Sequence, residues 1–191
     1  MSLVTDIKED AEWLIRMVEN ILTVTRISEE TGTISKTPEA AEEIISEAVM
    51  KFRRRYDVPV EITIPDELML IPMDAILIEQ VIVNLLENSV LHGKTTTLIK
   101  LTLSSDGENA VFSVADNGSG INEKKLPMLF SGYFIHAEEQ SGDVKRNMGI
   151  GLSVCLTIIK AHGGTMTAGN LPEGGAEFTF TLPLELSLIH I

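Results

Sequence analysis

The sequence predicts an α/β fold preceded by one long helix. Apolar residues recur at the spacing of an amphipathic helix in four segments, whereas apolar and polar residues alternate, as in a strand, in five others. The two kinds of segment are interleaved along the chain, which is typical of a sheet covered by helices. The predicted helices span residues 4–28, 39–52, 74–93 and 152–161. The predicted strands span residues 60–64, 97–103, 110–116, 165–168 and 176–183.

The composition fits one folded domain with an appendage. The 191 residues are 44% hydrophobic, which is enough for one core. The net charge of −13 disfavours nucleic acid as a partner, because no basic stretch is dense enough to offset phosphate repulsion. The single cysteine, Cys155, rules out an internal disulfide and suits a reducing cytosol. No segment is expected to span a membrane or to act as a signal peptide.

The first predicted helix carries a heptad seam. Its apolar positions follow spacings of four and three: Ile7, Ala11, Leu14, Val18, Ile21 and Thr25. This regularity favours packing against another helix, in a bundle or coiled coil, over an amphipathic helix that lies on its own domain. Residues 31–38 contain Gly32 and Pro38 and are predicted to be a linker.

The other elements have recognisable boundaries. Asp74 is the expected N-cap of the third helix and Gly93 its stop. Asp106 and Gly107 predict the turn of a hairpin. Residues 122–130 are expected to form a short helix, and residues 131–148 a long polar loop that is either a lid or an ordinary flexible segment. Residues 185–191 are predicted to be a tail, disordered or vector-derived.

Three polar residues interrupt the apolar helix at 74–93. Asn84 and Asn88 are four residues apart and share a face with Glu87. Asn is a poor helix former, so these residues need a reason to be there. Amide and carboxylate oxygens one turn apart suit Mg²⁺, which binds through few protein groups plus substrate phosphates. A solvated polar stripe is the alternative.

Two glycine-containing stretches suggest a nucleotide site. Asp116 ends the apolar face of a strand and is followed by Gly118 and Gly120, so a carboxylate and a closely approaching backbone could read a purine amino group. The alternative is an Asp-capped turn. Gly149 and Gly151 open the last helix, where free backbone N–H groups favour phosphate. No Gly-Lys-Ser/Thr follows, so this is not a Walker loop.

The order of the motifs is more specific than any one of them. NLLENS at residues 84–89, DNGSGI at 116–121, GIGLSVC at 149–155 and GGAEFTFTLP at 174–183 resemble the N, G1, G2 and terminal Gly-rich boxes of the ATP-binding domain of sensor histidine kinases. LPMLFSGYF at 126–134 resembles a variant F box. The first helix is similar to the second helix of the dimerisation and phosphotransfer hairpin. The run PMDAILIEQVIVNLLENSVLHG and the later AHGG are closest to the KdpD-type potassium-responsive kinases.

The resemblance implies a fold, a cofactor and partners. The fold is the two-layer α/β sandwich of the gyrase–chaperone–kinase ATPase superfamily, a mixed sheet backed by helices, at residues 39–184, with the hairpin-like helix at 1–30. The implied ligands are ATP and Mg²⁺. The implied partners are the His-bearing dimerisation helices of a homodimeric parent kinase and a response regulator. The implied location is the cytoplasmic side of a membrane-anchored sensor.

The resemblance also implies roles for individual residues. Asn88 would coordinate Mg²⁺, supported by Asn84, with Glu87 as the acidic residue beside them, and Asn84 and Glu87 would be the catalytic residues. Asp116 would accept a hydrogen bond from the adenine amino group. The remaining nucleotide contacts would come from Gly118, Gly120, Arg146, Gly149 and Gly151. His92, which stands where the family usually has an aromatic residue or a His, is a further expected nucleotide contact.

The sequence departs from the family pattern at several places. Leu91 stands where the family has a Lys, Asn147 replaces the first glycine of the G2 run, and the F box lacks its usual Pro. None of the four histidines is followed by the motif of a phosphoacceptor box. The chain is therefore expected to be a fragment of a longer kinase. It is expected to bind MgATP but to have no His of its own to phosphorylate. Two alternatives remain: an ATP-hydrolysing relative, for which Asn84 lacks the basicity to be the catalytic base, and a non-catalytic binding module.

Overall fold

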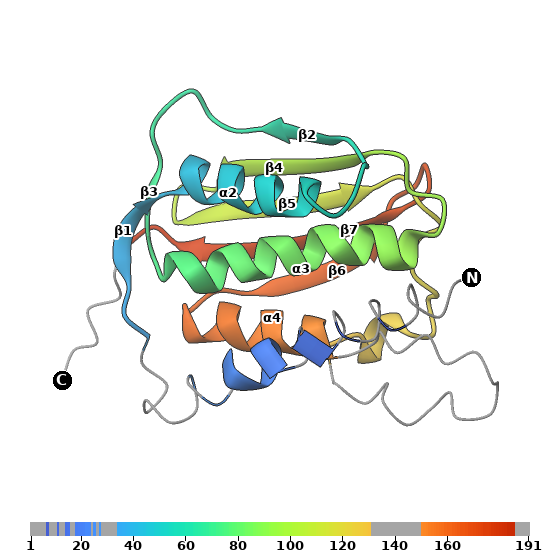
Figure 1. Cartoon of the computed structure of the whole chain (residues 1–191). Coiled ribbons are helices and arrows are strands. Elements are labelled where there is room, and N and C mark those ends of the chain that lie inside the picture. The colour runs from blue at the N-terminus through green and yellow to red at the C-terminus, as the bar shows by residue number, and fades with distance from the viewer. Residues whose placement is uncertain are drawn as a thin grey trace.

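The computed structural model describes residues 34–130 and 150–185 throughout, and residues 7, 11, 14, 15, 18–23, 25 and 27 of the N-terminal segment. In this part of the chain, a five-stranded sheet has the order β2-β4-β5-β7-β6, and three helices cover one of its faces (Figure 1). The strands are β2 (Val60–Thr63), β4 (Ile99–Ser105), β5 (Asn109–Asp116), β6 (Met166–Asn170) and β7 (Ala176–Pro183). The helices are α2 (Ala41–Arg53), α3 (Ala75–Gly93) and α4 (Ile150–Ala161).

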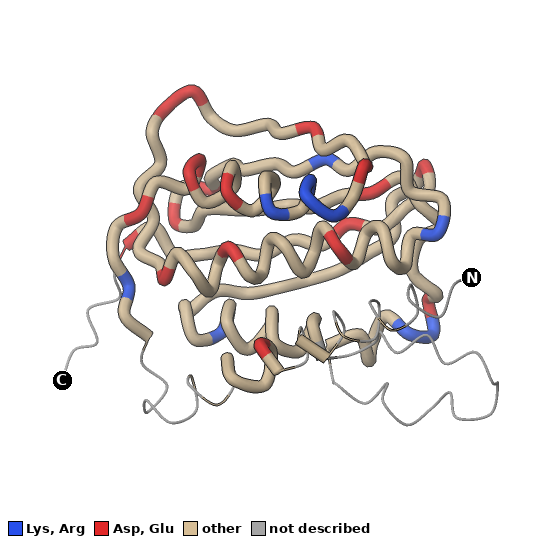
Figure 2. Tube along the Cα trace, viewed as in Figure 1, with Lys and Arg blue, Asp and Glu red and all other residues tan. Residues whose placement is uncertain are grey.

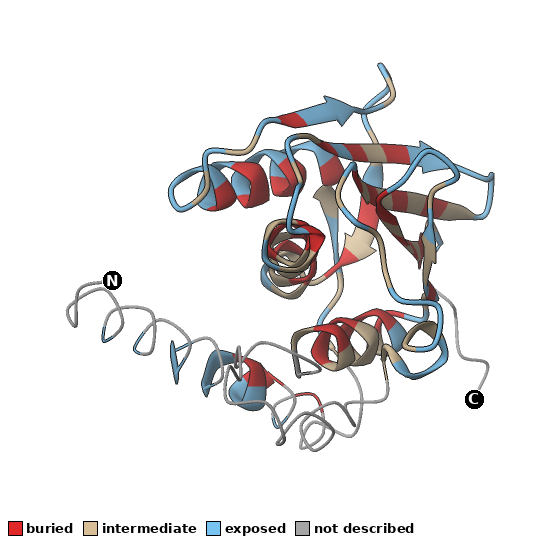
Figure 3. Cartoon of the chain, turned by 90° about the vertical axis from the view of Figure 1, so that its right-hand side faces the viewer, coloured by how far each residue is buried: buried red, intermediate tan, exposed pale blue. Residues whose placement is uncertain are grey.

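The sheet is mixed, as predicted. β2 pairs with β4 in parallel, and the other neighbouring pairs are antiparallel. β4 and β5 form the predicted hairpin, in which Gly107 adopts a φ of 100° that favours glycine. The two-layer α/β sandwich is confirmed: Figure 3 shows the helices on one side of the sheet, with their buried residues turned towards it.

The alternating pattern of the central strands places every second side chain in the core. Residues of β5 and β7 alternate between buried and half-buried, so that each strand has one face against the helices. Phe112 and Phe180 are fully buried neighbours in register, with ring centroids 4.6 Å apart. Burying each ring contributes about 2–3 kcal/mol to folding, so this pair joins the middle of the sheet to the helical layer.

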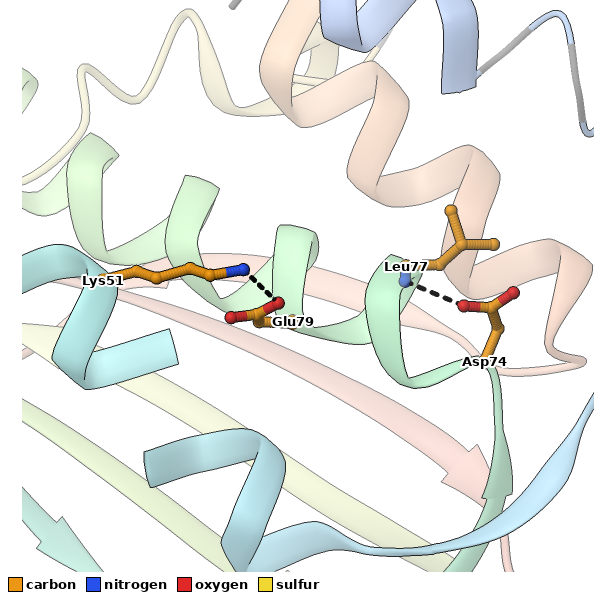
Figure 4. A network of polar contacts seen from close by, with 4 residues as sticks. All are labelled: Lys51, Asp74, Leu77 and Glu79. Carbon is orange, nitrogen blue, oxygen red and sulfur yellow. Dashed lines mark hydrogen bonds and ion pairs between the residues drawn. The ribbon is translucent and has the colours of Figure 1, made fainter. Parts of the chain in front are cut away.

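Helix α3 is the central element of the helical layer. Asp74 is its N-cap: a side-chain oxygen accepts from the backbone N–H of Leu77 at 3.1 Å (Figure 4). The helix ends at Gly93, as predicted, and Lys94 takes the positive φ of 56°. By length and composition α3 could cross a membrane, which corrects the expectation that no segment meets that test. Its apolar stripe is buried in the core of this domain, and a core helix passes the same test.

Ion pairs join α2 to α3. Lys51 donates to a carboxylate oxygen of Glu79 at 2.6 Å (Figure 4), and Arg55, just beyond the end of α2, donates to Glu87 at 3.2 Å. Both carboxylates are buried, whereas both cations are half exposed. The basic run at residues 53–55 therefore also contacts α3, because Arg55 pairs with the buried carboxylate of Glu87.

Two short strands were not predicted. β1 (Thr37–Ala40) pairs antiparallel with β3 (Leu70–Met73), so residues 37 and 38 belong to a strand and not to the linker. Each strand has four residues and contains a proline, which is unfavourable inside a large sheet but tolerated in a two-stranded ribbon. The helix expected at residues 122–130 is reduced to turns and a 3₁₀ segment, Leu126–Met128, with a proline inside it. The predicted loop at 131–148 and the end of the predicted tail lie outside the described residues.

His162 connects the end of α4 to the start of α3. Its Nε2 accepts from the backbone N–H of Asp74 at 3.0 Å, and its Nδ1 lies 2.8 Å from the carbonyl oxygen of Ile158. Nδ1 therefore carries the proton and the ring is neutral. Its side chain is 1% exposed, and this burial, assisted by Lys36, lowers the pKa of His162.

We expect the chain to lose stability as the pH falls below about 6.5, the ordinary pKa of histidine. The unfolded chain then takes up a proton that the folded chain resists, because protonated Nε2 cannot accept from Asp74. Urea unfolding at pH 7.5 and pH 5.5 measures this effect. The His162→Gln variant should be less stable at pH 7.5 and should show a smaller difference between the two pH values; an equal difference would contradict the assignment.

Candidate functional site

The carboxylate of Asp116 lies at the end of β5, buried beside two glycine-containing turns. The residue is 4% exposed, and its Oδ1 accepts from the backbone N–H groups of Gly118 at 2.8 Å and Ala176 at 3.3 Å. Among the residues that the structure describes, none donates to Oδ2. A carboxylate held by one oxygen and free at the other can accept a hydrogen bond from a ligand N–H group.

The backbone around Asp116 is close-packed. A Cβ at Gly118 would come within 2.6 Å of the carbonyl oxygen of Gly93, so only glycine fits there. Gly120 has a φ of 72°, which also favours glycine. The close approach of Gly118 to Gly93 places the turn after β5 against the end of α3. The residues predicted to read a nucleotide base therefore lie beside the helix that carries the predicted metal ligand.

Two asparagines that the sequence analysis did not single out hold this turn in place. Asn170 of β6 accepts from the backbone N–H of Ile121 at 2.6 Å and donates to its carbonyl oxygen at 2.7 Å. Asn117 accepts from the N–H groups of Thr97 and Leu98 at 2.9 and 3.1 Å. Asparagines next to glycines read as ordinary turn residues in a sequence, so only the long-range pairing reveals their function.

The amide of Asn88 has an unmet hydrogen-bonding group. The residue is half-buried, yet its Nδ2 is buried without a partner among the described residues. A buried polar atom without a partner costs about 1–3 kcal/mol, so a ligand that engages this amide removes a penalty. The oxygen and nitrogen of an amide exchange places on a 180° turn, so the same side chain can present its oxygen to a metal ion. An amide oxygen presented in this way is a ligand that Mg²⁺ accepts.

Asn84 lies one turn earlier and points towards α4. Its Nδ2 donates to the sulfur of Cys155 at 3.7 Å, which leaves its oxygen for other contacts. Burial raises the pKa of the Cys155 thiol to about 12, so this cysteine is protonated at neutral pH. Asn84 thus ties α3 to the helix whose first turn is predicted to face the phosphates.

Glu87, one of the predicted catalytic residues, contacts the end of α2. Its carboxylate is 7% exposed and pairs with Arg55, at the basic end of α2 that Figure 2 shows in blue. The ion pair gives Glu87 a structural function in joining two helices.

We expect Glu87→Gln to lower the free energy of unfolding by about 1–2 kcal/mol, less than for a fully buried pair because Arg55 is half exposed. ATP affinity should change less than threefold. Urea unfolding and calorimetry check the two effects, and Arg55→Met should be non-additive with Glu87→Gln in the double variant. A large loss of ATP turnover at unchanged stability would instead support the catalytic role.

The other predicted site residues are only partly placed. His92 is half-buried in the last turn of α3, and Gly151 lies in the first turn of α4 with open space around it. Arg146 and Gly149 lie outside the described residues. Within the described part of the chain, no group of three or more His, Cys, Asp or Glu residues could hold a metal ion. A metal here would depend on few protein ligands together with the ligand's own oxygens.

The fold and this arrangement of residues define a class of nucleotide-binding domain. Residues 73–186 match the HATPase_c family, described as histidine kinase-, DNA gyrase B-, and HSP90-like ATPase. The chain belongs to this family. The matches below also identify it as an ATPase catalytic domain of the kind found in two-component sensor histidine kinases, as the motifs predicted.

Similar proteins include two that are named sensor protein KdpD. The sensor protein KdpD of Clostridium acetobutylicum is 38% identical over 185 residues, which are 96% of this chain and 20% of that protein. KdpD of Escherichia coli is 34% identical over 168 residues, 88% of this chain and 18% of that protein. The chain therefore spans about a fifth of the length of these relatives.

Solved structures agree with these matches. The nucleotide-free catalytic domain of the histidine kinase ThkA has a TM-score of 0.67 at 26% identity, covering 78% of this chain and 96% of that one. Full-length ShkA in complex with AMPPNP has a TM-score of 0.72 at 23% identity over 94% of this chain and 38% of that one, which is a likeness of fold alone.

Proposed function

We propose that the chain binds MgATP and, within a longer sensor protein, donates the γ-phosphoryl group of ATP to a histidine on a dimerisation hairpin. The free oxygen of the buried Asp116 carboxylate is the observation that carries this proposal. It would accept a hydrogen bond from the adenine amino group, and it would repel a carbonyl oxygen at the same place. This geometry favours adenine over guanine, because guanine has an oxygen where adenine has its amino group.

In this reaction the described residues would hold the base and the phosphates of ATP in position. The bond between the γ-phosphorus and the β–γ bridging oxygen breaks, a bond to the histidine nitrogen forms, and ADP leaves. Asp116 and the turn at Gly118 would orient the base, while Asn88 and Asn84 would lie at the phosphate end of α3. Bound Mg²⁺, held by Asn88 and the phosphates, would neutralise negative charge on the transferring group. Arg146, Gly149 and Gly151 are proposed as phosphate contacts.

The residues at this end of α3 favour phosphotransfer over hydrolysis. Asn84 cannot take a proton from water at neutral pH, and Glu87 is paired with Arg55. His92, at the end of the same helix, is proposed as a nucleotide contact. With no described carboxylate free to activate water at Asn88, we infer that the acceptor is a histidine of the longer protein.

The partners follow from the same proposal. The seam residues of the N-terminal segment that the structure describes are exposed, including Leu14, Val18 and Ile21 at 51–54%, which supports helix pairing in a homodimeric parent. The phosphoryl group would pass from the histidine to an aspartate of a response regulator. We propose residues 1–30 as a hairpin helix, 39–184 as the catalytic domain, and the cytoplasmic side of a membrane as its location.

Two experiments test the proposal. Calorimetric titration of the chain with ATP, with and without Mg²⁺, should show Mg²⁺-dependent binding and weaker binding of GTP. The chain should then phosphorylate a supplied hairpin that carries the acceptor histidine, with radiolabel from γ-labelled ATP appearing on the hairpin. Absence of binding at millimolar ATP would overturn the nucleotide site. Binding with release of free phosphate in place of labelled hairpin would favour an ATPase.

A further inference from the structure

One amide side chain of α3 forms two hydrogen bonds to the N-terminal helix, whose Ile27 is also buried against the core. The Nε2 of Gln80 donates to the Oδ1 of Asn20 at 3.0 Å, and the Oε1 of Gln80 accepts from the hydroxyl of Thr23 at 3.0 Å. Both ends of the Gln80 amide are therefore bonded to residues three apart, which lie on one face of the helix. We call these three residues the polar clasp.

The clasp uses a different face of the helix from the heptad seam. Asn20, Thr23 and Ile27 are spaced three and four apart and are 7–9% exposed. Val18 and Ile21, which belong to the seam, are 54% and 51% exposed. Docking on α3 therefore leaves the apolar seam uncovered, and the two faces can be occupied independently.

The contact around the clasp is incomplete. A groove of about 580 Å³ lies between the N-terminal helix and the α2–α3 pair, with Glu19 and Leu22 on one wall and Val83 and Glu87 on the other. A helix packed by continuous apolar contact would leave no groove of this size. The two hydrogen bonds of Gln80 therefore carry much of the specificity of the contact, because moving the helix by one residue would separate both partners from the amide.

We propose that Gln80 is the docking residue for the N-terminal helix, and that the polar clasp sets the balance between a docked and an undocked arrangement of that helix. A hydrogen bond between neutral side chains contributes modestly to stability, so two such bonds hold the helix reversibly. Loss of Gln80 also leaves the Asn20 amide oxygen without its donor in a docked helix, which favours the undocked arrangement further, whereas the Thr23 hydroxyl keeps its bond to the carbonyl oxygen of Glu19 at 2.9 Å.

Hydrogen–deuterium exchange of the whole chain tests this proposal. In Gln80→Leu, amides of residues 18–27 should exchange roughly tenfold faster than in the parent chain, because loss of two bonds shifts the docking equilibrium by about that factor. Exchange in β5 and β7 should be unchanged. Thr25→Ala is the matched control, since the Thr25 hydroxyl bonds only to its own helix, at Ile21 and Leu22. It should leave exchange at Asn20 and Thr23 near the parent rate.

A triple variant separates the clasp from damage to α3. Replacing Gln80 and Asn20 by Leu and Thr23 by Val removes all three polar partners together, and apolar groups of similar shape can substitute with little loss. This variant should recover slow exchange of the helix. Parent-like exchange in Gln80→Leu would overturn the proposal, as would fast exchange that the triple variant fails to slow. Both readouts are independent of ATP, so they do not depend on the proposed kinase activity.

Discussion

Replacing Asp116 by Asn should weaken ATP binding by about 10- to 100-fold and abolish the preference for ATP over GTP. A hydrogen bond to a charged acceptor contributes about 1.5–3 kcal/mol, which corresponds to this loss. Asn retains an oxygen for the N–H groups of Gly118 and Ala176 but offers an amide nitrogen where the free carboxylate oxygen was. That nitrogen would repel the adenine amino group and could donate to the carbonyl oxygen of guanine.

Calorimetry with ATP and GTP measures both effects in one series. Asp106→Asn is the matched control, because Asp106 is an aspartate that accepts backbone N–H bonds in the exposed β4–β5 turn, far from the end of β5. It should leave both affinities unchanged. Equal binding of ATP and GTP by the unmodified chain would contradict the role of Asp116. An Asp116→Asn variant that still prefers ATP to GTP would also contradict it. The unfolding midpoint of the variant shows whether the turn has been damaged.

The sequence predicted the parts of the fold that depend on local pattern. The stripe of α3 and the alternation of β5 and β7 each have the period of their element, and burial follows that period in the structure. β1 and β3 were missed because four-residue strands with a proline carry almost no periodic signal. Their pairing is between residues 30 to 36 positions apart, which a local pattern cannot show.

For the candidate site, the sequence predicted the features that depend on local pattern and missed the long-range contacts. The buried position of Asp116 followed from strand alternation, and the close fit of Gly118 followed from the Gly-x-Gly turn. The pairing of Glu87 with Arg55 did not follow, because spacing on α3 places Glu87 near both asparagines and says nothing about α2. Long-range polar contacts decide which of several neighbouring polar residues face a ligand, and they depend on the packing of whole helices.

Asn88 should be the residue on which Mg²⁺-dependent binding depends. We expect Asn88→Ala to weaken binding of MgATP by about 10- to 100-fold, since a lost metal ligand or its supporting contact typically costs that much. The unpartnered Nδ2 adds a second expectation: without nucleotide, the variant should be as stable as the parent or slightly more stable, because a buried polar atom without a partner has been removed.

Calorimetry in Mg²⁺ and in chelator, together with urea unfolding of the free chain, measures these effects. For the stability measurement, Asn84→Ala is the comparison from the same helix. The Asn84 amide has a partner in Cys155, so its loss should reduce the free energy of unfolding. Binding of ATP in chelator should be the same for the parent and Asn88→Ala, since the metal is absent from both. If Asn88→Ala loses affinity equally with and without Mg²⁺, the metal ligand is another residue and Asn88 contacts the nucleotide itself. The two halves of the experiment thus separate coordination of the metal from recognition of ATP at the same side chain.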